Sequence, residues 1–485
     1  MIRRSASWLF AILLCALITF FTVVRREAIT TSATFNYYAG PRSDILASQG
    51  KFWKQFRADL DKYGPKVQGL IERGGHDLSN RFDASRSPPR PDYLQMAVTQ
   101  WEALSKAHSD FVEHIRSRTY RLPYNADTRG IVTTAGGAYL PVALVSIRML
   151  RETGSELPVE VFLSSWSEWD PVICSKILPT LNATCNVLQD VFDHDKHTRK
   201  RPLEKYQYKI MAILFSSFEE VLFLDSDSFP IHKANDLFES EPFTSTGLVL
   251  WPDFWFPSES PLFFEIAAIE PPKLSERAST EAGEILYSKR KHENSLLLAA
   301  YYNYYGPNYF YPLQSQGAPG EGDKETFLWS AVALGEPFYH VKTGVHALGY
   351  KTRKGEWRGS AMAHFDPIQD YRPTITEQNA AQDANQTYPR PYFLHVNFPK
   401  LDPGQIFDPE SFGAAGPTKD ADGKMRRIWF DDAQSSISFF GFDLEKKVFE
   451  VVRDIACEYE GKIKSWRGKL HVCGKAQRHY DNVFD

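Results

Sequence analysis

The sequence lacks an excess of charge of either sign. Its 485 residues carry 56 Lys and Arg against 60 Asp and Glu, a net charge of −4, and the isoelectric point is about 6.4. Proteins that bind nucleic acid concentrate Lys and Arg on one face or along one helix, and no basic patch with interleaved aromatic residues is found here. The composition therefore does not indicate a nucleic-acid partner, and its apolar fraction of 43% is typical of a packed globular protein.

Cysteine is scarce, with five residues in the whole chain. Cys15 lies in an apolar run near the N-terminus, and the other four cysteines permit three different pairings. We expect the two pairs that are closest in the sequence, Cys174–Cys185 and Cys457–Cys473, and free buried thiols are the alternative. Disulfides would agree with an oxidising compartment for the body of the protein.

One apolar run, residues 8–24, is long enough to span or enter a membrane. It holds 17 uncharged residues between Arg3–Arg4 and Arg25–Arg26, which is at the short end of what spans a bilayer as a helix. A secretory signal peptide is the alternative, but its small-x-small cleavage site is missing. We therefore expect a signal anchor with residues 1–7 in the cytosol and the large body in the lumen, and short spans fit the thinner membranes of the early secretory pathway.

The chain after the anchor divides into a stem and a lumenal domain. Residues 25–124 are predicted to form a stem, with helical patterns at 52–72 and 93–118 and a proline-containing turn region at 85–93 between them. We interpret this stem as a spacer that holds the rest of the protein away from the membrane. Residues 125–485 are predicted to form the lumenal domain.

The pattern of residues from 125 onward alternates between strands and helices. The expected strands are 129–137, 157–164, 219–227 and 246–255, and the expected helices are 138–154, 170–181 and 202–218. The strands are apolar throughout, which predicts an α/β domain with a mostly parallel sheet that helices cover on both faces. Ligands of such sheets bind beyond the carboxyl ends of the strands.

Two aspartates one residue apart, Asp225 and Asp227, end the most apolar of these strands. Like charges resist burial unless a cation lies between them, and two carboxylates suit Mg²⁺ or Mn²⁺. Phosphatases of the haloacid-dehalogenase type carry a related motif, but Phe229 breaks their pattern. Nucleotide-sugar glycosyltransferases of the GT-A fold place a nucleotide-binding α/β half before an Asp-x-Asp motif, and this order predicts the GT-A fold, with a Rossmann-like sheet.

Three blocks of sequence make the resemblance specific: "GIVTTAGGAYLPVALVSIRMLRETGSELPVEVF" (130–162), "EKYQYKIMAILFSSFEEVLFLDSDSFPI" (204–231) and "GEGDKETFLWSAVALGEPFY" (320–339). They resemble the fungal α-mannosyltransferases of the Mnn1/Mnn2 family, and more closely the Mnn2 type. The resemblance spans roughly 125 to 400. It implies a type II Golgi membrane protein, dependent on Mn²⁺, that transfers mannose from GDP-mannose to a mannose-containing glycan with retention of the α configuration.

Several outcomes stay open under this resemblance. An α-1,2 linkage is favoured over α-1,3, and a UDP-sugar donor on the same fold is an alternative. More distant alternatives are a metal phosphohydrolase and a non-catalytic Golgi scaffold. Other Golgi mannosyltransferases are candidate partners.

The resemblance also implies roles for the metal and phosphate ligands. Asp227 would bind the metal directly, and Asp225 would contact it through water or bind the ribose of the nucleotide. His395 would be the third metal ligand, with Lys400 on the phosphates. His364 is the rival ligand, and we expect an ordinary packed histidine there.

The remaining candidates lie on the helix before the metal strand and at the end of the first strand. Lys209 would reach the diphosphate or the mannose, and a solvated or snorkelling lysine is the alternative, while its helix neighbour Lys205 is expected to be solvated. Thr133, Thr134 and Gly136 end the first strand of the domain, where backbone amides could contact guanine or ribose.

Two acidic residues, Asp323 and Glu325, precede an expected helix and are the catalytic candidates, with Asp323 preferred over Glu325. Carboxylates also favour helix N-termini without any function. Retention can proceed through a covalent glycosyl-enzyme or by attack from the same face with the departing phosphate as base. We prefer the second route because it needs no protein nucleophile.

Overall fold

The computed structural model describes residues 44–72, 80–193, 202–317, 319, 322–352, 355–376, 388–408, 416–420 and 422–485. The predicted anchor, residues 8–24, lies outside this part of the chain, as does Cys15. Among the residues described, no helix combines the length and the apolarity needed to cross a membrane.

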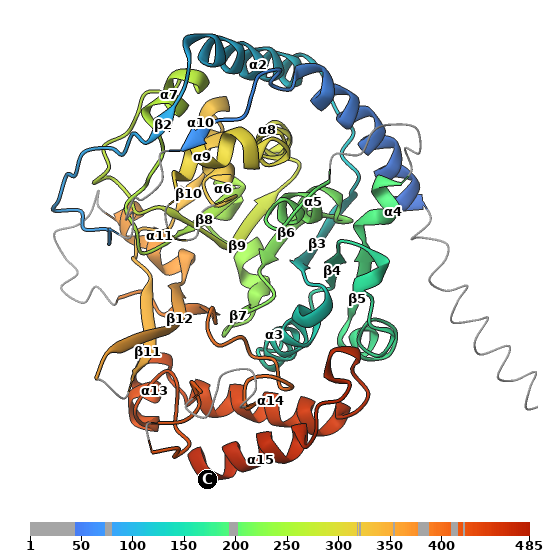
Figure 1. Ribbon diagram of the computed structural model, residues 1–485, viewed down its shortest axis with the longest axis vertical. Coiled ribbons are helices and arrows are strands. Elements are labelled where there is room, and N and C mark those ends of the chain that lie inside the picture. Colours follow the sequence, from blue (N-terminus) through green and yellow to red (C-terminus); the bar gives the residue numbers. More distant parts are fainter. Residues whose placement is uncertain are drawn as a thin grey trace, which may run out of the picture.

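A seven-stranded sheet forms the centre of the molecule (Figure 1), in the strand order β10-β8-β9-β6-β3-β4-β5. Its strands are β3 (Asn125–Thr134), β4 (Val159–Leu163), β5 (Ala183–Val187), β6 (Phe218–Leu224), β8 (Leu248–Pro252), β9 (Thr280–Ser288) and β10 (Tyr339–His340). The α/β class and the four expected strands are confirmed. The sheet is mostly parallel, as predicted, and β9 is its antiparallel strand, between β6 and β8.

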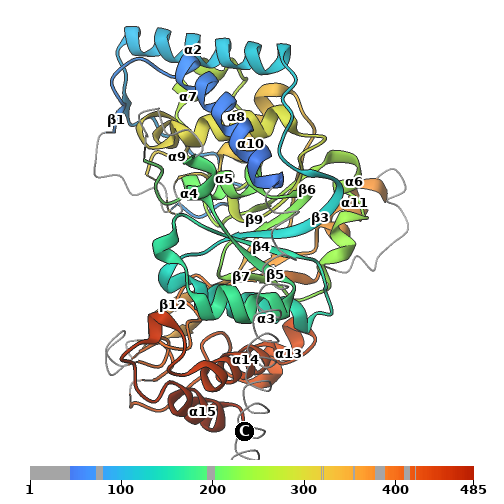
Figure 2. The same ribbon diagram turned by 90° about the vertical axis from the view of Figure 1, so that its right-hand side faces the viewer.

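Helices cover both faces of this sheet (Figure 2). One face carries α3 (Leu140–Glu152), α13 (Ala433–Phe440), α14 (Leu444–Tyr459) and α15 (Val472–Val483), and the other carries α2 (Val98–Ser117), α5 (Gln207–Phe215), α7 (Pro261–Ala267), α8 (Glu293–Tyr304) and α10 (Thr326–Leu334). Successive side chains of a strand point to opposite faces. Ile131 therefore joins the core under α3, while Val132 joins the core under α5 and α8.

A second, four-stranded antiparallel sheet adjoins the carboxyl ends of the central strands. Its order is β11-β12-β13-β7, with β7 (Ser228–Pro230), β11 (His346–Lys351), β12 (Trp357–Phe365) and β13 (Pro391–His395). β7 follows β6 after a turn of three residues, Asp225 to Asp227. The Asp-x-Asp motif therefore lies where one sheet passes into the other.

The remaining elements are short or peripheral. They are β1 (Ile71–Glu72), β2 (Leu94–Gln95), α4 (Leu188–Phe192), α6 (Phe243–Thr246), α9 (Tyr311–Ser315) and α11 (Pro367–Thr376), together with single-turn helices at Gly137–Tyr139, Trp166–Glu168, Ile173–Ile177, Leu178–Leu181, Ala234–Phe238, Gly306–Phe310 and Lys464–Trp466. The expected helix at 170–181 is thus two irregular turns.

The described part of the expected stem, 44–72 and 80–124, belongs to the folded body, and this corrects the predicted boundary at residue 124. A helix spans 44–63 and α2 follows the turn region, as the helical patterns indicated. Phe56 and Phe111 are fully buried, and Phe111 stacks on Tyr301 of α8 with 4.3 Å between the ring centroids. The apolar faces of both helices complete the core over α8, so the described residues of 44–72 and 80–124 pack onto the body and do not form a separate spacer.

Two disulfides join neighbouring segments, and both were predicted. Cys174 pairs with Cys185, and Cys457 of α14 pairs with Cys473 of α15. The bonded cysteines are 11 and 16 residues apart, so each bond closes a short loop and restricts the unfolded chain less than a longer loop would.

Candidate active site

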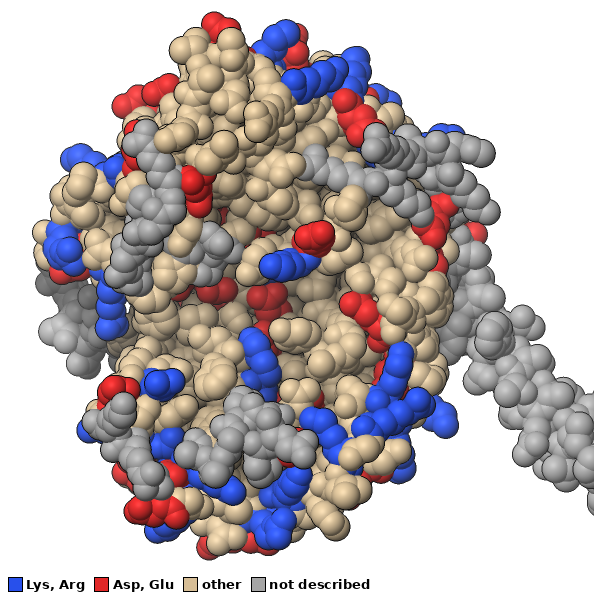
Figure 3. Space-filling view, in the orientation of Figure 1, with Lys and Arg blue, Asp and Glu red and all other residues tan. Residues whose placement is uncertain are grey.

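A cleft of about 1070 Å³ opens at the carboxyl ends of β3, β4 and β6, between the two sheets. This is where ligands bind in open α/β sheets. Figure 3 shows acidic side chains recessed near the centre of this face, with basic side chains around the opening. The lining combines acidic, basic and aromatic residues, including Tyr139, Glu168, Lys209, Asp225, Asp227, Asp253, Glu281, Asp323, Lys324, His395 and Lys400.

The three predicted metal ligands meet at the floor of this cleft. Beyond β6 the chain turns, and the Ser228 amide donates to the Asp225 carbonyl at 2.9 Å, so both aspartates face the cleft. β13 pairs with β7 in a register that places His395 opposite Ser228. Ligand atoms of Asp225, Asp227 and His395 all lie within 4.8 Å of one another. Two carboxylates and one imidazole in this arrangement fit a divalent cation such as Mn²⁺ or Mg²⁺.

Two lysines balance the charge of the aspartates. Lys400 forms an ion pair with Asp227, and Lys209 of α5 lies with its Nζ 3.2 Å from Asp225 Oδ1 and 3.5 Å from Asp323 Oδ2. Lys209 also donates to the Ala282 carbonyl at 2.6 Å, which holds it in the cleft. Both lysines that the sequence assigned to the donor therefore lie beside the predicted metal ligands.

The pKa values reflect the competition between burial and these neighbours. Burial raises the pKa of Asp225, and Lys209 opposes this only in part. Burial also acts to raise the pKa of Asp227, but His395 and Lys400 outweigh it and hold the pKa well below its usual value. Burial alone would lower the pKa of His395, whereas the Asp227 carboxylate raises it to about 10. The pocket thus favours positive charge between its carboxylates.

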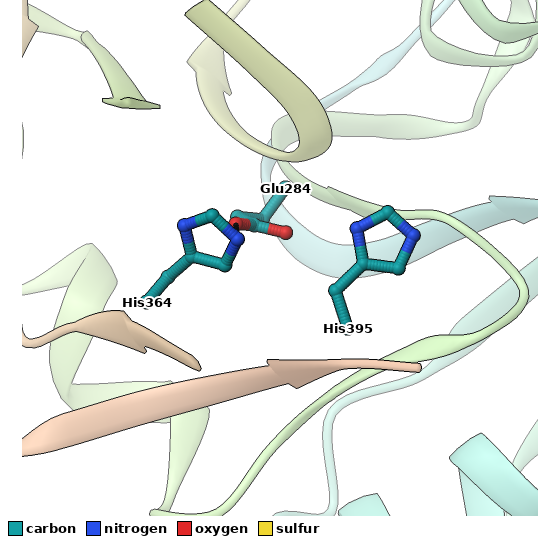
Figure 4. A group of neighbouring side chains, drawn as sticks. All are labelled: Glu284, His364 and His395. Carbon is teal, nitrogen blue, oxygen red and sulfur yellow. Dashed lines mark ion pairs between the residues drawn. The ribbon is translucent and has the colours of Figure 1, made fainter. Parts of the chain in front are cut away.

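A second group of ligand atoms lies behind His395 (Figure 4). Glu284 of β9, His364 of β12 and His395 have ligand atoms within 4.8 Å of one another, and His364 Nε2 lies 3.0 Å from Glu284 Oε1. Burial lowers the pKa of His364 to about 3 and raises that of Glu284 well above its usual value. His364 is thus a buried histidine, as expected. It lies beside Glu284 and His395, and its ring nitrogens are not in the group of ligand atoms that includes the two aspartates.

The two catalytic candidates separate in the structure. Asp323 lines the cleft, and burial raises its pKa to about 6, with Lys209 opposing. The prediction for Glu325 is wrong, because Glu325 lies outside the cleft lining. It forms an ion pair with Arg277 at 3.0 Å and accepts the Thr280 amide at 2.8 Å. Glu325 therefore anchors the start of β9.

Of the residues predicted near the end of β3, some line the cleft and one does not. Thr134 and Gly136 line the cleft, as does Lys205, which was expected to be solvated. Thr133 does not reach the cleft: its side chain is buried toward α3, beside Ser146. Alternate residues of a strand face opposite sides, so only one of the two threonines could point into the cleft.

Several charged residues of the cleft lining were not predicted, among them Glu281, Asp253 and Lys324. Glu281 of β9 accepts hydrogen bonds from the Ala282 and Gly283 amides at 3.0 and 2.7 Å, and its Oε1 lies 3.7 Å from His395 Nδ1. Asp253 and Lys324 form an ion pair of 3.1 Å. Glu281 lies in a run of polar residues, "STEAGE" (279–284). This run does not have the apolar pattern of a central strand, so β9 was not predicted.

Comparison with known proteins identifies relatives over most of the chain. A family described as "Mannosyltransferase putative" matches residues 128–278 and 272–366. The Candida albicans alpha-1,2-mannosyltransferase MNN21 is 33% identical over 80% of this chain and 66% of that protein. The Saccharomyces cerevisiae alpha-1,2-mannosyltransferase MNN2 is 29% identical over 76% of this chain and 71% of that protein. The Candida albicans alpha-1,2-mannosyltransferase MNN24 is 33% identical over 76% of this chain and 60% of that protein. The chain thus spans about two thirds of the length of these relatives.

Solved structures give a weaker likeness. The galactosyltransferase LgtC, in complex with donor and acceptor sugar analogues, aligns with a TM-score of 0.35 and 12% identity over 70% of this chain and 100% of that chain. Mouse xyloside xylosyltransferase 1 aligns with a TM-score of 0.26 and 12% identity over 44% and 84%. Scores this low do not define the fold. The sequence relatives do define the family: the chain belongs to the Mnn2-type family of fungal α-mannosyltransferases.

Proposed function

We propose that the protein transfers mannose from GDP-mannose to the terminal mannose of an α-mannoside glycan, with retention and with an α-1,2 linkage. The observation that carries the proposal is the cluster of Asp225, Asp227 and His395 at the floor of the cleft, in a chain of this family. An α-1,3 linkage, or a UDP-sugar donor in a GT-A fold, is the alternative that shares the same cluster.

Residues of the chain would bind the diphosphate end of the donor. Asp225, Asp227 and His395 would hold Mn²⁺ or Mg²⁺, which when bound neutralises the charge that develops on the departing diphosphate. Lys209 and Lys400 flank the aspartates and place two further positive charges for phosphate oxygens. The Lys400 side chain is 37% exposed, so it is free to move from Asp227 to a phosphate.

Carboxylates of the chain would face the reacting sugar. Asp323 and Glu281 both line the cleft next to the aspartates. A carboxylate beside the anomeric carbon stabilises the positive charge that develops there. In the same-face route the bond from C1 to the phosphate breaks, the acceptor oxygen bonds C1, and the hydroxyl proton passes to the phosphate. Glu281 adds a second carboxylate that could instead serve a covalent route.

The location of the protein is part of the same proposal. Residues 8–24 would anchor it as a type II protein in the Golgi membrane, with the catalytic body in the lumen and other Golgi mannosyltransferases as neighbours. The disulfides Cys174–Cys185 and Cys457–Cys473 support an oxidising compartment.

The test is transfer by the full-length protein purified in detergent. With Mn²⁺, GDP-mannose and a short α-mannoside, we expect release of GDP and an α-1,2-linked product in linkage analysis. Chelation of the metal should stop the reaction. Transfer from UDP-sugars but not from GDP-mannose would show that the donor is a UDP-sugar. Hydrolysis of simple phosphate esters without an acceptor would show that the protein is a phosphohydrolase.

A further inference from the structure

One acidic residue of the cleft, Glu168, has no role in the chemistry described above. It ends the single-turn helix Trp166–Glu168, which follows β4. β4 is the second strand from β6 in the order β6-β3-β4, so the end of β4 lies about 10 Å from the end of β6, where the aspartates are. A nucleoside diphosphate carries its phosphates and its base at opposite ends of the ribose, and it can bridge a separation of this size.

The Glu168 carboxylate is held in place at one oxygen. Its Oε2 accepts a hydrogen bond from the Ser164 amide at 2.8 Å. Within the described part of the chain, no donor is found for Oε1. The carboxylate also lies against Gly136, where a Cβ atom would collide with it. The backbone of Gly136 is extended, with φ −158°, so the glycine is needed here for space and not for its conformational freedom.

An exposed aromatic ring lines the same cleft. Tyr139 follows Gly136 by three residues and is 50% exposed, although it belongs to the cleft lining. A large ring left half exposed inside a cleft offers a face on which a base can stack. Trp166, in the same short helix as Glu168, is equally exposed but lies outside the lining and donates its Nε1–H to Asp190 at 2.7 Å.

The chemistry of a fixed carboxylate discriminates among bases. Guanine presents two neighbouring donors, N1–H and the 2-amino group, which a carboxylate can accept as a pair. Uracil presents one N–H between two carbonyl oxygens, which a carboxylate repels. Each carboxylate oxygen accepts two hydrogen bonds, so Oε2 keeps its bond to Ser164 while it accepts from a base. We propose that Glu168 selects a guanine nucleotide by binding the N1–H and 2-amino edge, with the base stacked on Tyr139.

This inference rests on the proposed function, in that it assumes a nucleotide donor in the cleft. The experiment measures binding of GDP, inosine 5′-diphosphate and UDP to the full-length protein with Mn²⁺ by isothermal titration calorimetry. Inosine diphosphate differs from GDP only in lacking the 2-amino group. We expect the wild type to prefer GDP over inosine diphosphate by about 10-fold or more, because a hydrogen bond to a charged group contributes that much.

The variant Glu168→Gln should lose this preference. The amide oxygen can still accept from Ser164, so the fold is kept, but the side chain no longer offers two acceptors. We expect GDP affinity to fall about 10- to 100-fold and the ratio of GDP to inosine diphosphate affinity to approach one. Gly136→Ala should have the same effect, because the added methyl group displaces the carboxylate. The control Asp190→Asn, outside the cleft, should keep the wild-type ratio.

The outcomes separate the two proposals. A folded Glu168→Gln variant with the wild-type ratio would overturn the role of Glu168 and leave the mannosyltransferase proposal intact. A wild type that binds UDP more tightly than GDP would overturn the GDP donor itself. Loss of the ratio in Glu168→Gln, with the control unchanged, supports the selection of guanine.

Discussion

Two clusters of buried charge lie next to each other in this protein, and they differ in how completely their atoms are paired. In the first, Arg277 contacts Glu259 and Glu325 at 3.0 Å each, and Glu259 also accepts from Trp329 and Arg90. In the second, carboxylates of Asp225, Asp227, Glu281 and Asp323 converge on the cleft, and buried atoms such as Asp323 Oδ2 and His395 Nδ1 lack a hydrogen-bond partner within the described residues.

The contrast distinguishes buried charges that stabilise the fold from buried charges that can bind a ligand. A buried charge costs free energy unless it is paired, so a closed network can persist as architecture. An open cluster persists only if a ligand or a cation completes it. Asp323 and Glu325 are two residues apart, yet they belong to different clusters, and only the contacts distinguish their roles.

The largest expected effect is on the open cluster. Asp227→Asn removes one ligand charge without opening a cavity, so we expect kcat/KM for transfer to fall on the order of 10³-fold while cooperative thermal unfolding is kept. The control is Glu239→Gln, because Glu239 is 71% exposed and its ion pair with Arg129 lies at the surface. Near-normal turnover of Asp227→Asn would refute the metal assignment.

The closed cluster should respond in stability and not in chemistry. Arg277→Met leaves Glu259 and Glu325 buried without their shared cation, so we expect the free energy of unfolding in urea to fall by about 3–5 kcal/mol. Arg358→Met, at an exposed pair with Glu356, should change it by less than about 1 kcal/mol. Equal effects of both substitutions would remove the distinction between the two clusters.

A smaller effect should appear behind the metal ligands. Glu284 lies beside the rings of both His364 and His395 (Figure 4), and groups in contact with a ligating histidine fix its orientation. We expect Glu284→Gln to weaken Mn²⁺ binding about 10- to 100-fold, measured by electron paramagnetic resonance of free Mn²⁺. At saturating Mn²⁺ kcat should return close to the wild-type value. A low kcat that excess metal does not restore would show that Glu284 acts in another way.

The smallest effect concerns a buried histidine far from the cleft. Burial lowers the pKa of His479 in α15 to about 3, and its ring lies between Phe407 and Phe449. The unfolded chain binds a proton at this position below pH 6.5 and the folded chain does not, so stability is full above pH 6.5 and falls as pH drops toward 3. His479→Phe should flatten this slope by up to about 1.4 kcal/mol per pH unit, measured by urea unfolding at pH 6.5 and pH 5. An unchanged slope would contradict the assignment.

Local pattern predicted much of the α/β core and part of the site. The apolar runs before Thr134 and before Asp225 became β3 and β6. Asp225 lies in the cleft as the resemblance implied, and Lys209 lies there as its place on the helix before β6 predicted. β9 escaped prediction because Glu281 and Glu284 interrupt its apolar pattern. Those two glutamates are tolerated in a central strand because the cleft and the histidines next to them need carboxylates there.

The two helices between 44 and 117 were predicted as helices but were wrongly assigned to a separate stem, for a different reason. Their amphipathic pattern predicted helices but not the surface against which they pack. Phe111 is buried against Tyr301 on α8, and Phe56 is buried against Phe111 and Tyr120. A pattern in one segment does not reveal its partner when that partner is about 200 residues away.

The sequence by itself determined the alternation of strands and helices, the two aspartates after a buried strand, and the pairing of cysteines that lie close together. Each of these follows from interactions between residues near in the chain. Only the tertiary structure decided that His395 and not His364 joins the aspartates, that Glu325 is excluded, and that Glu168 and Glu281 enter the cleft. Such choices depend on the register of distant strands, as between β13 and β7, where a shift of one residue would reverse every side chain.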